Sequence, residues 1–295
     1  ENKTEIENMK KTDNGTLILD GKSLAKKIQE HIKEEIIKSG KMIKLATVLV
    51  GDDKPSQLYV NNKHKQAELS GIESVHINLP GNSSQDDIEK RIQELGDDKS
   101  INGILIQMPL PDGLDSDSII QMIPTNKDVD GLKEQNLGRL IVGNDVLRPC
   151  TPLGVMKLLK HYEIETSGKN ALVIGRSRLV GMPQVLMLGK KGVDCTVTLA
   201  HSRTKNIDEL ISDSEIVVSA VGIPKIVNAN NAKTGSILID VGISGGSGGI
   251  QGDVDFEGVD GIAGAVTPMP GGTGPMTVAC LLENTVKAAN LQGII

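Results

Sequence analysis

The feature that most constrains the fold is a repeated alternation of short apolar runs with longer amphipathic stretches. The runs are continuous in Val, Ile and Leu, which is typical of parallel strands buried on both faces. Such strands are expected at residues 16–19, 45–51, 74–79, 101–108, 170–174, 195–199, 215–220 and 236–241. The alternation predicts an α/β architecture in which helices cover parallel-type sheets.

The stretches between these strands have the spacing of amphipathic helices. Helices are expected at residues 23–39, 55–70, 84–95, 151–162, 181–190, 207–212 and 274–291. Because the pattern runs twice, we predict two domains, residues 16–150 and 151–273, with a cleft between them. Helix 274–291 is expected to pack back on the first domain, and the polar residues 1–15 are expected to be a disordered tail.

The composition argues against several function classes. Aromatic residues make up 1% of the chain and the net charge is −6, so neither stacking platforms nor a basic surface for nucleic acid is expected. The three cysteines and five histidines are scattered, so no disulfide framework and no metal site are expected. No apolar run reaches membrane-spanning length, so no membrane partner is expected. We expect a cytoplasmic protein; the alternative is an organelle matrix after removal of a targeting segment, because the sequence begins without Met.

The second predicted domain opens with a strand, a turn that contains glycines, and a helix. The turn reads GRSRLVG, from Gly175 to Gly181. Such a unit can bind a dinucleotide pyrophosphate through close backbone approach and free N–H groups at the helix start. The spacing is not GxGxxG, so an ordinary strand–helix turn is an equal alternative.

The end of the next strand favours NADP over NAD. NAD sites usually place an acidic residue there, whereas this chain has His201-Ser202-Arg203. No carboxylate is present to repel a 2′-phosphate, and Ser202 and Arg176 could donate hydrogen bonds to one. The alternative is a solvated loop with a surface arginine.

Candidate catalytic residues follow strands of the first domain, whose carboxyl ends should share one edge. Tyr59 and Lys63 form an i,i+4 pair on one helix face. A desolvated lysine can serve as acid or base, although a lone lysine is more often a surface residue. Gln107 ends a strand and could point at the same place. Asp130 could accept hydrogen bonds from an amino-heterocycle such as a pterin, or could simply form a turn.

Two further motifs have structural interpretations. Pro149-Cys150-Thr151-Pro152 is typical of a helix start with Thr151 as the N-cap, and Cys150 has no visible histidine partner, so a structural role is favoured over a nucleophile. Gly21-Lys22-Ser23 resembles the end of a phosphate loop but lacks its first glycine, so a helix start is expected there.

Together these segments resemble the bifunctional methylenetetrahydrofolate dehydrogenase/cyclohydrolase family from about Leu17 to Leu291. Any one motif could arise by chance, whereas the ordered series is specific. The motifs are SQLYVNNK (56–63) followed by Gly71-Ile72, QMPLP (107–111), KDVDG (127–131), PCTP (149–152), GRS (175–177), VGMP (180–183), His201-Ser202 with Thr204, DVGI (240–243), GDVDF (252–256) and TPMPGGTGPMT (267–277).

The resemblance implies an activity and a cofactor. Members oxidise 5,10-methylenetetrahydrofolate to the 5,10-methenyl form with NADP and hydrolyse that product to 10-formyltetrahydrofolate. This chemistry belongs to one-carbon metabolism and purine biosynthesis. Both steps act on one carbon, so one cleft can serve both, and the protein supplies position and proton transfer. The resemblance also implies a Rossmann-like second domain and a homodimer formed through it.

The resemblance further implies a role for each site residue. Lys63 would be the general acid/base residue, tuned by Gln107, with Tyr59 beside the folate and Asp130 anchoring the pterin. Further substrate contacts are implied for Pro270, Gly271 and Gly272. The implied cofactor-binding residues are Thr151, Ser177 and Ile243 near the nicotinamide, Arg176 and Ser202 at the 2′-phosphate, and Gly175 in the turn. The chain departs from the family at Gln66, Ala200 and Thr273; Thr273 lies near the substrate in the family, so substrate affinity is the property in question.

Two alternatives stay open at this point. Another two-domain α/β dehydrogenase, of amino-acid or shikimate type, would share the architecture but should lack the series formed by Tyr59, Lys63, Gln107 and Asp130. A catalytically inactive nucleotide-sensing protein is the second alternative, and the intact polar set argues against it. Mixing the protein with NADP and methylenetetrahydrofolate and measuring NADPH would distinguish these two alternatives from the folate enzyme.

Overall fold

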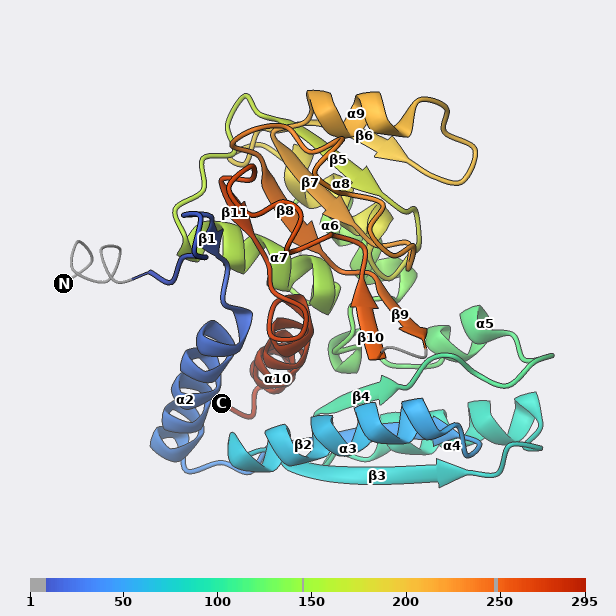
Figure 1. The fold of residues 1–295 in the computed structure, drawn as a ribbon. Coiled ribbons are helices and arrows are strands. Elements are labelled where there is room, and N and C mark those ends of the chain that lie inside the picture. Colours follow the sequence, from blue (N-terminus) through green and yellow to red (C-terminus); the bar gives the residue numbers. More distant parts are fainter. Residues whose placement is uncertain (1–8, 145, 247–248) are drawn as a thin grey trace. The chain divides into compact units, whose positions relative to one another are not determined.

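The computed structural model describes residues 9–144, 146–246 and 249–295, which divide into two compact units (Figure 1). One unit contains Lys26–Cys150 and Val278–Ile295, and we call it the three-stranded unit. The other contains Thr151–Thr277 and the described residues up to Ala25, and we call it the six-stranded unit. The helices α2 (Gly21–Ser39), α7 (Cys150–His161) and α10 (Thr273–Leu291) carry the chain from one unit to the other.

The three-stranded unit is built on a parallel sheet in the order β3-β2-β4. Its strands are β2 (Lys44–Val50), β3 (Glu73–Leu79) and β4 (Gly103–Ile106). Its helices are α3 (Lys54–Leu69), α4 (Gln85–Asp97), α5 (Ser116–Gln121), the 3-10 helix η1 (Thr125–Lys127) and α6 (Glu134–Val142). In α4 the spacing of Ile88, Ile92 and Leu95 places all three on one face, and this face packs into the core of the unit with strand residues such as Ile104.

The six-stranded unit contains a parallel sheet in the order β1-β11-β8-β7-β5-β6. The strands are β1 (Leu17–Ile18), β5 (Asn170–Ile174), β6 (Thr196–Ala200), β7 (Ile216–Ser219), β8 (Ile237–Asp240) and β11 (Ala265–Val266). The helices α8 (Gly181–Gly189) and α9 (Ile207–Asp213) follow β5 and β6. Ala171 and Val173 of β5 belong to one apolar core, and Leu172 and Ile174 belong to another, so the strand is buried on both faces.

The expected helices and strands are present, and each end lies within two residues of the expected position. Two interpretations need correction. The strand expected at 16–19 was assigned to the first domain, whereas β1 pairs with β11 at the edge of the six-stranded sheet. Nothing in the local pattern of residues 16–19 indicates this partner, because the pairing joins Leu17 to Ala265.

The second correction concerns the expected disordered tail. Residues 1–8 lie outside the described residues. Residues 9–15 form a hydrogen-bonded turn: Lys11 bridges to Leu17, Asn14 Nδ2 donates to Asp260 at 3.0 Å, and Thr12 Oγ1 also donates to Asp260. Polar side chains here pair with a carboxylate that is distant in sequence, so polarity alone does not imply disorder.

Several short elements were not expected from the sequence. They are α5, η1, α6, β11 and the antiparallel hairpin formed by β9 (Ile243–Gly246) and β10 (Gly249–Gly252). At the C-terminus, the later part of α10 belongs to the three-stranded unit, where Gln292 donates hydrogen bonds to the carbonyls of Asn102 and Asn126. Within the described ranges, no helix is both long enough and apolar enough to span a membrane.

Candidate functional site

Helix α3 presents Lys63 because of how the helix starts and which face it buries. Its N-cap, Asp53, accepts a hydrogen bond of 2.9 Å from the backbone N of Ser56, and a proline occupies the first turn. The buried residues Ser56, Val60 and Ala67 mark the face that packs on the sheet. Lys63 falls on this face by helical spacing, so its side chain is half-buried rather than free on the surface.

Lys63 and Gln107 are brought together directly. Lys63 Nζ donates a hydrogen bond of 2.8 Å to Gln107 Oε1. The other end of the amide is also fixed, because Gln107 Nε2 donates to the Met108 carbonyl at 2.9 Å. Gln107 is buried directly after β4, and its backbone N bonds to the carbonyl of Val48 in β2. The sheet therefore aims the amide oxygen at the ammonium.

The surroundings of Lys63 form a charged cluster with Asp130 and Cys150. Burial lowers the pKa of Lys63, while the nearby Asp130 carboxylate partly opposes this decrease. Burial also raises the pKa of Asp130, and the charge of Lys63 opposes that increase. A lysine with a lowered pKa can donate and accept protons nearer neutral pH than an ordinary lysine, as general acid/base chemistry requires.

Cys150 takes part in this cluster as a neutral thiol. Burial raises the pKa of Cys150, and the adjacent Asp130 carboxylate raises it further. Its Sγ donates to the carbonyl of Val129 at 3.3 Å. A buried thiol with a raised pKa is a poor nucleophile, which agrees with the structural role expected for it.

Asp128 is a supporting residue that the sequence did not single out. Its buried carboxylate accepts hydrogen bonds from the backbone N of Lys133 at 2.9 Å and from Asn136 Nδ2 at 2.8 Å. Burial raises the pKa of Asp128. Gly131 completes the turn at φ +67°, and a Cβ there would come within 2.5 Å of the Arg148 backbone. The turn that carries Asp130 is therefore fixed on both sides.

The remaining candidate substrate residues are Tyr59, on the same helix as Lys63, and three residues of the six-stranded unit, Pro270, Gly271 and Gly272. Tyr59, four residues before Lys63 on α3, is 47% exposed and can therefore be reached by a ligand. Pro270 is exposed in the six-stranded unit. The carbonyl of Gly271 accepts from the Lys22 backbone N at 2.9 Å, and a Cβ on Gly272 would lie 2.6 Å from the Pro268 carbonyl, so both glycines allow close backbone packing.

The turn between β5 and α8 requires its two outer glycines. Gly175 has φ +113°, and a Cβ on Gly181 would lie 1.9 Å from the Gly175 carbonyl. Ser177 Oγ accepts a hydrogen bond of 3.1 Å from the Val180 backbone N, and Arg176 is exposed. Val180 makes no side-chain capping hydrogen bond at the start of α8. The Met182 backbone N donates to the Ser177 carbonyl at 3.0 Å and Pro183 has no N–H, so among the first three residues of α8 only Gly181 has an N–H available to an anion.

The turn after β6 lies beside the turn after β5. Ile174 and Ala200 are partners in the sheet register, so Arg176 and Ser202 each lie two residues beyond a paired position. Ser202 is exposed, and the turn is held by a 2.8 Å hydrogen bond from the His201 backbone N to Thr204 Oγ1. The residues present fit a dinucleotide with a 2′-phosphate: two glycines permit backbone approach, and polar or cationic side chains follow both strands.

Thr151 differs from its expected position at the helix boundary. Helix α7 begins at Cys150, so Thr151 lies inside the first turn and is not the N-cap. Its hydroxyl lies 2.9 Å from the hydroxyl of Thr277, a partner distant in sequence. Ile243, the other residue expected near the nicotinamide, is 46% exposed at the start of β9.

A pair of buried carboxylates, Asp240 and Asp253, was missed because its motifs contributed only to the family resemblance. Asp253 Oδ2 accepts from Ser219 Oγ at 2.7 Å and from the Val221 backbone N at 2.9 Å. The Asp240 carboxylate accepts from the backbone N of Asp253 and of Val254, both at 3.0 Å. The pair thereby fixes the ends of β7 and β8, just before Ile243. Across the described residues, no group of three or more His, Cys, Asp or Glu side chains could hold a metal ion.

The chain matches two family models in order. The model of the tetrahydrofolate dehydrogenase/cyclohydrolase catalytic domain matches residues 19–130, and the model of the NAD(P)-binding domain of the same family matches residues 149–293. The bifunctional protein FolD of Methanoculleus marisnigri is 46% identical over 277 residues, which cover 94% of this chain and 97% of that protein. The bifunctional protein FolD of a Wolbachia strain is 47% identical over 283 residues, which cover 94% and 96%.

Solved structures agree with these matches. The bifunctional FolD methylenetetrahydrofolate dehydrogenase/cyclohydrolase of Campylobacter jejuni is 43% identical with a TM-score of 0.91, over 94% of this chain and 100% of that one. The Trypanosoma brucei enzyme, solved with NADP and an inhibitor, is 33% identical with a TM-score of 0.90, over 95% and 99%. The family expected from the motifs is confirmed. Because both domain models match in order and the relatives align over nearly the whole chain, this protein belongs to the tetrahydrofolate dehydrogenase/cyclohydrolase family.

Proposed function

We propose that the protein oxidises 5,10-methylenetetrahydrofolate to 5,10-methenyltetrahydrofolate with NADP and then hydrolyses the product to 10-formyltetrahydrofolate. The observation that carries this proposal is the 2.8 Å hydrogen bond from Lys63 Nζ to Gln107 Oε1, beside Asp130 and within the segment matched by the catalytic-domain model. A lysine held by a neutral acceptor and a carboxylate is suited to moving protons at one carbon centre.

In the hydrolytic step Lys63 would act first as base and then as acid. The neutral amine at Nζ accepts a proton from the water whose oxygen bonds to the methenyl carbon. The carbon–nitrogen bond of the ring then breaks, the folate nitrogen takes up a proton from Nζ, and the hydroxyl proton leaves to solvent as the formyl group forms. Burial lowers the pKa of Lys63, so the neutral amine is more abundant near neutral pH than in an exposed lysine.

Gln107 and Asp130 would have separate roles around that lysine. The Gln107 amide is fixed by its bond to the Met108 carbonyl and orients Nζ without adding charge. The Asp130 carboxylate would accept hydrogen bonds from the amino edge of the pterin, with Tyr59 beside the folate. We also propose substrate contacts for Pro270, Gly271 and Gly272. The cleft between the two domains stays a prediction of the sequence.

NADP supplies the hydride acceptor when it is bound. The residues that would hold it are all in the segment matched by the NAD(P)-binding model. The turn from Gly175 to Gly181 and the start of α8 would hold the pyrophosphate, and Arg176 and Ser202 would donate to the 2′-phosphate. Thr151, Ser177 and Ile243 would line the nicotinamide, in the Rossmann-like arrangement expected from the sequence.

We propose that the protein acts in one-carbon metabolism and purine biosynthesis, in the cytoplasm, as a homodimer formed through the nucleotide-binding domain. The family resemblance supports this assembly. Light scattering on the protein as it elutes from a size-exclusion column should give twice the mass of the 31.3 kDa chain. A monomeric mass at micromolar concentration would contradict the homodimer.

Two absorbance assays test the activity. Purified protein mixed with NADP and methylenetetrahydrofolate should produce NADPH. In a second assay, the protein should hydrolyse methenyltetrahydrofolate faster than the compound is hydrolysed in buffer alone. Omission of either substrate is the control for the first assay. NADP binding without turnover would indicate a nucleotide-sensing protein instead, and NADPH production with no accelerated hydrolysis would contradict the cyclohydrolase activity.

A further inference from the structure

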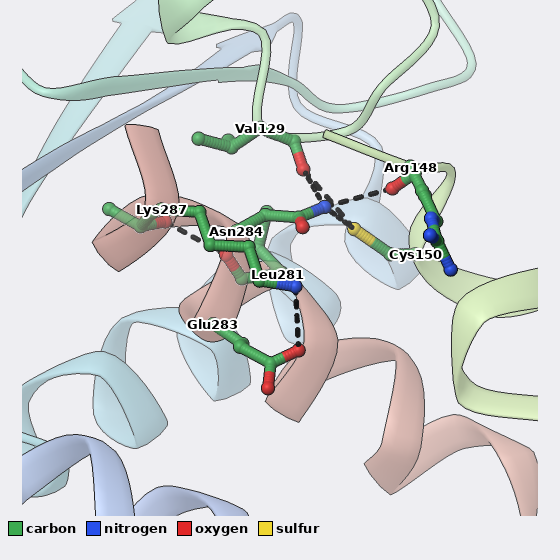
Figure 2. Close-up of polar contacts among 8 residues, drawn as sticks. Val129, Arg148, Cys150, Leu281, Glu283, Asn284 and Lys287 are labelled. Carbon is green, nitrogen blue, oxygen red and sulfur yellow. Dashed lines mark hydrogen bonds and ion pairs between the residues drawn. The ribbon is translucent and has the colours of Figure 1, made fainter. Parts of the chain in front are cut away.

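Helix α10 contributes one fully buried amide to the three-stranded unit, that of Asn284. Figure 2 shows its side chain directed at two backbone carbonyls and a sulfur. Asn284 Nδ2 donates to the Val129 carbonyl at 2.9 Å and to the Arg148 carbonyl at 2.8 Å, and it lies 3.6 Å from Cys150 Sγ. These three partners lie 134 to 155 positions from Asn284 in sequence.

The two carbonyls belong to the segments that carry the charged cluster. Val129 directly precedes Asp130, and Arg148 lies two residues before Cys150. The two segments also touch through their backbones, because a Cβ on Gly131 would approach the Arg148 carbonyl carbon to 2.5 Å. A single amide therefore joins the turn that carries Asp130 to the segment that carries Cys150, and holds both against α10.

The chemistry of the site explains why the residue is an asparagine. Both partners are carbonyls, which only accept hydrogen bonds, and a side-chain amide nitrogen has two N–H donors, one for each. Asn284 Oδ1 is buried with no hydrogen-bond partner among the described residues. A buried acceptor without a partner is unfavourable, so the donor end of the amide is what this position uses.

We infer that Asn284 is a positioning residue of the catalytic centre, and that its two donated hydrogen bonds hold the Asp130 carboxylate in place beside Lys63 and against the bound folate. This inference rests on the proposed function. It adds a residue of the C-terminal helix to a centre otherwise formed by residues 59–150. Asp130 supports the ionised form of Lys63, so displacement of Asp130 should lower the pKa of Lys63 further.

The test uses the intact chain with Asn284→Leu, which removes both donors while keeping the same branched arrangement of side-chain heavy atoms. Asn290→Ala is the matched control, because Asn290 is exposed six residues later on the same helix. We expect Asn284→Leu to lower the rate of methenyltetrahydrofolate hydrolysis by roughly ten- to a hundredfold, the effect of a misplacement of about 1 Å. The rising limb of the pH–rate profile should also move to lower pH, tetrahydrofolate should bind more weakly, and NADP affinity should be unchanged.

Asn284→Asp keeps the experiment decisive if the leucine variant does not fold. It preserves the shape of the side chain but offers at most one donor. We expect weaker tetrahydrofolate binding with unchanged NADP binding in this variant too. A folded variant with wild-type hydrolysis, pH profile and tetrahydrofolate affinity would overturn the inference, and so would equal losses of affinity for both ligands, because these indicate general loosening.

A readout independent of catalysis separates this inference from the proposed function. Loss of the Asn284 amide should make Cys150 more accessible. A thiol reagent should therefore alkylate Cys150 faster in Asn284→Leu than in the wild type, but not in Asn290→Ala. The alkylation rate is measured from the mass of the peptide that contains Cys150. If the wild-type protein shows no turnover, the proposed function fails. If turnover is normal and neither alkylation nor hydrolysis changes in the variant, the positioning role alone fails.

Discussion

The ammonium of Lys63 donates a 2.8 Å hydrogen bond to the side-chain carbonyl of Gln107, 44 positions later in the chain. One residue lies on α3 and the other directly follows β4, so the pairing depends on the parallel sheet between them. The amide is an uncharged acceptor whose other end is fixed by the Met108 carbonyl. The position of the Lys63 ammonium therefore depends on a fixed, uncharged hydrogen-bond acceptor as well as on nearby charges.

Replacing this neutral acceptor with a charged one should move the pH dependence of hydrolysis. In Gln107→Glu a carboxylate next to the ammonium favours its charged form, which raises the pKa of Lys63 against the effect of burial. Because the base is the neutral amine, the rising limb of the pH–rate profile should shift to higher pH. Gln57→Glu, an exposed change on the same helix as Lys63, is the control. An unshifted limb would contradict the proposed coupling.

Removal of the Asp130 carboxylate should weaken the binding of tetrahydrofolate but not the binding of NADP. Hydrogen bonds to charged groups are worth ~1.5–3 kcal/mol each, so Asp130→Ala should weaken tetrahydrofolate binding about ten- to a hundredfold. NADP binding, assigned to the other unit, should be nearly unchanged when both are measured by calorimetry. Asp112→Ala, at an exposed position, is the control. Equal loss of both ligands would indicate that Asp130 only forms a turn.

Cofactor choice should depend on Arg176. An arginine can donate two hydrogen bonds to a phosphate, so NADP should be strongly preferred over NAD, and Arg176→Ala should narrow this preference mainly by weakening NADP binding. Arg203→Ala is the comparison variant, because Arg203 is exposed on the neighbouring turn. The measurement is kcat/KM with each cofactor, with and without inorganic phosphate. Equal efficiency with NAD in phosphate-free buffer would refute this assignment.

The buried carboxylate of Asp240 should make stability depend on pH. Burial raises the pKa of Asp240 to about 6 in the folded protein, whereas an aspartate in an unfolded chain titrates near about 3.9. Between these values the folded state binds more protons, so the stabilisation from this group is lost as pH rises from about 4 to about 6. The stability of the wild type relative to Asp240→Asn should therefore fall across this range in denaturation curves. If the stability of the wild type relative to Asp240→Asn stayed constant or rose with pH across this range, the predicted direction of the pH dependence would be wrong.

The main architecture could be predicted from sequence because it depends on local patterns. The continuous apolar run of β5 is typical of a buried parallel strand, and the i,i+4 spacing of α4 is typical of an amphipathic helix. The position of β1 could not be predicted, because two residues that pair with Ala265 and Val266 leave no local signal. The hairpin of β9 and β10 was missed because its sequence is rich in Gly and Ser and lacks a strand pattern.

The candidate site divides in the same way. Lys63 and Gln107 could be proposed because each follows a recognisable strand, and the structure adds the hydrogen bond between them. Asn284 could not be proposed, because an asparagine inside an apolar helix looks ordinary until its two carbonyl partners are known. Asp128 and Asp253 are buried supports whose partners are fixed only by the fold.

The most direct test of the central claim, that Lys63 moves the protons of the hydrolytic step, is the rate of methenyltetrahydrofolate hydrolysis by Lys63→Ala. General acid/base groups contribute about 10²–10⁴-fold in rate, so this variant should lose hydrolysis by at least about a hundredfold while its thermal unfolding and NADP binding match the wild type. Lys65→Ala, an exposed lysine on the same helix, should keep full activity. Near-wild-type hydrolysis by a folded Lys63→Ala protein would contradict the account.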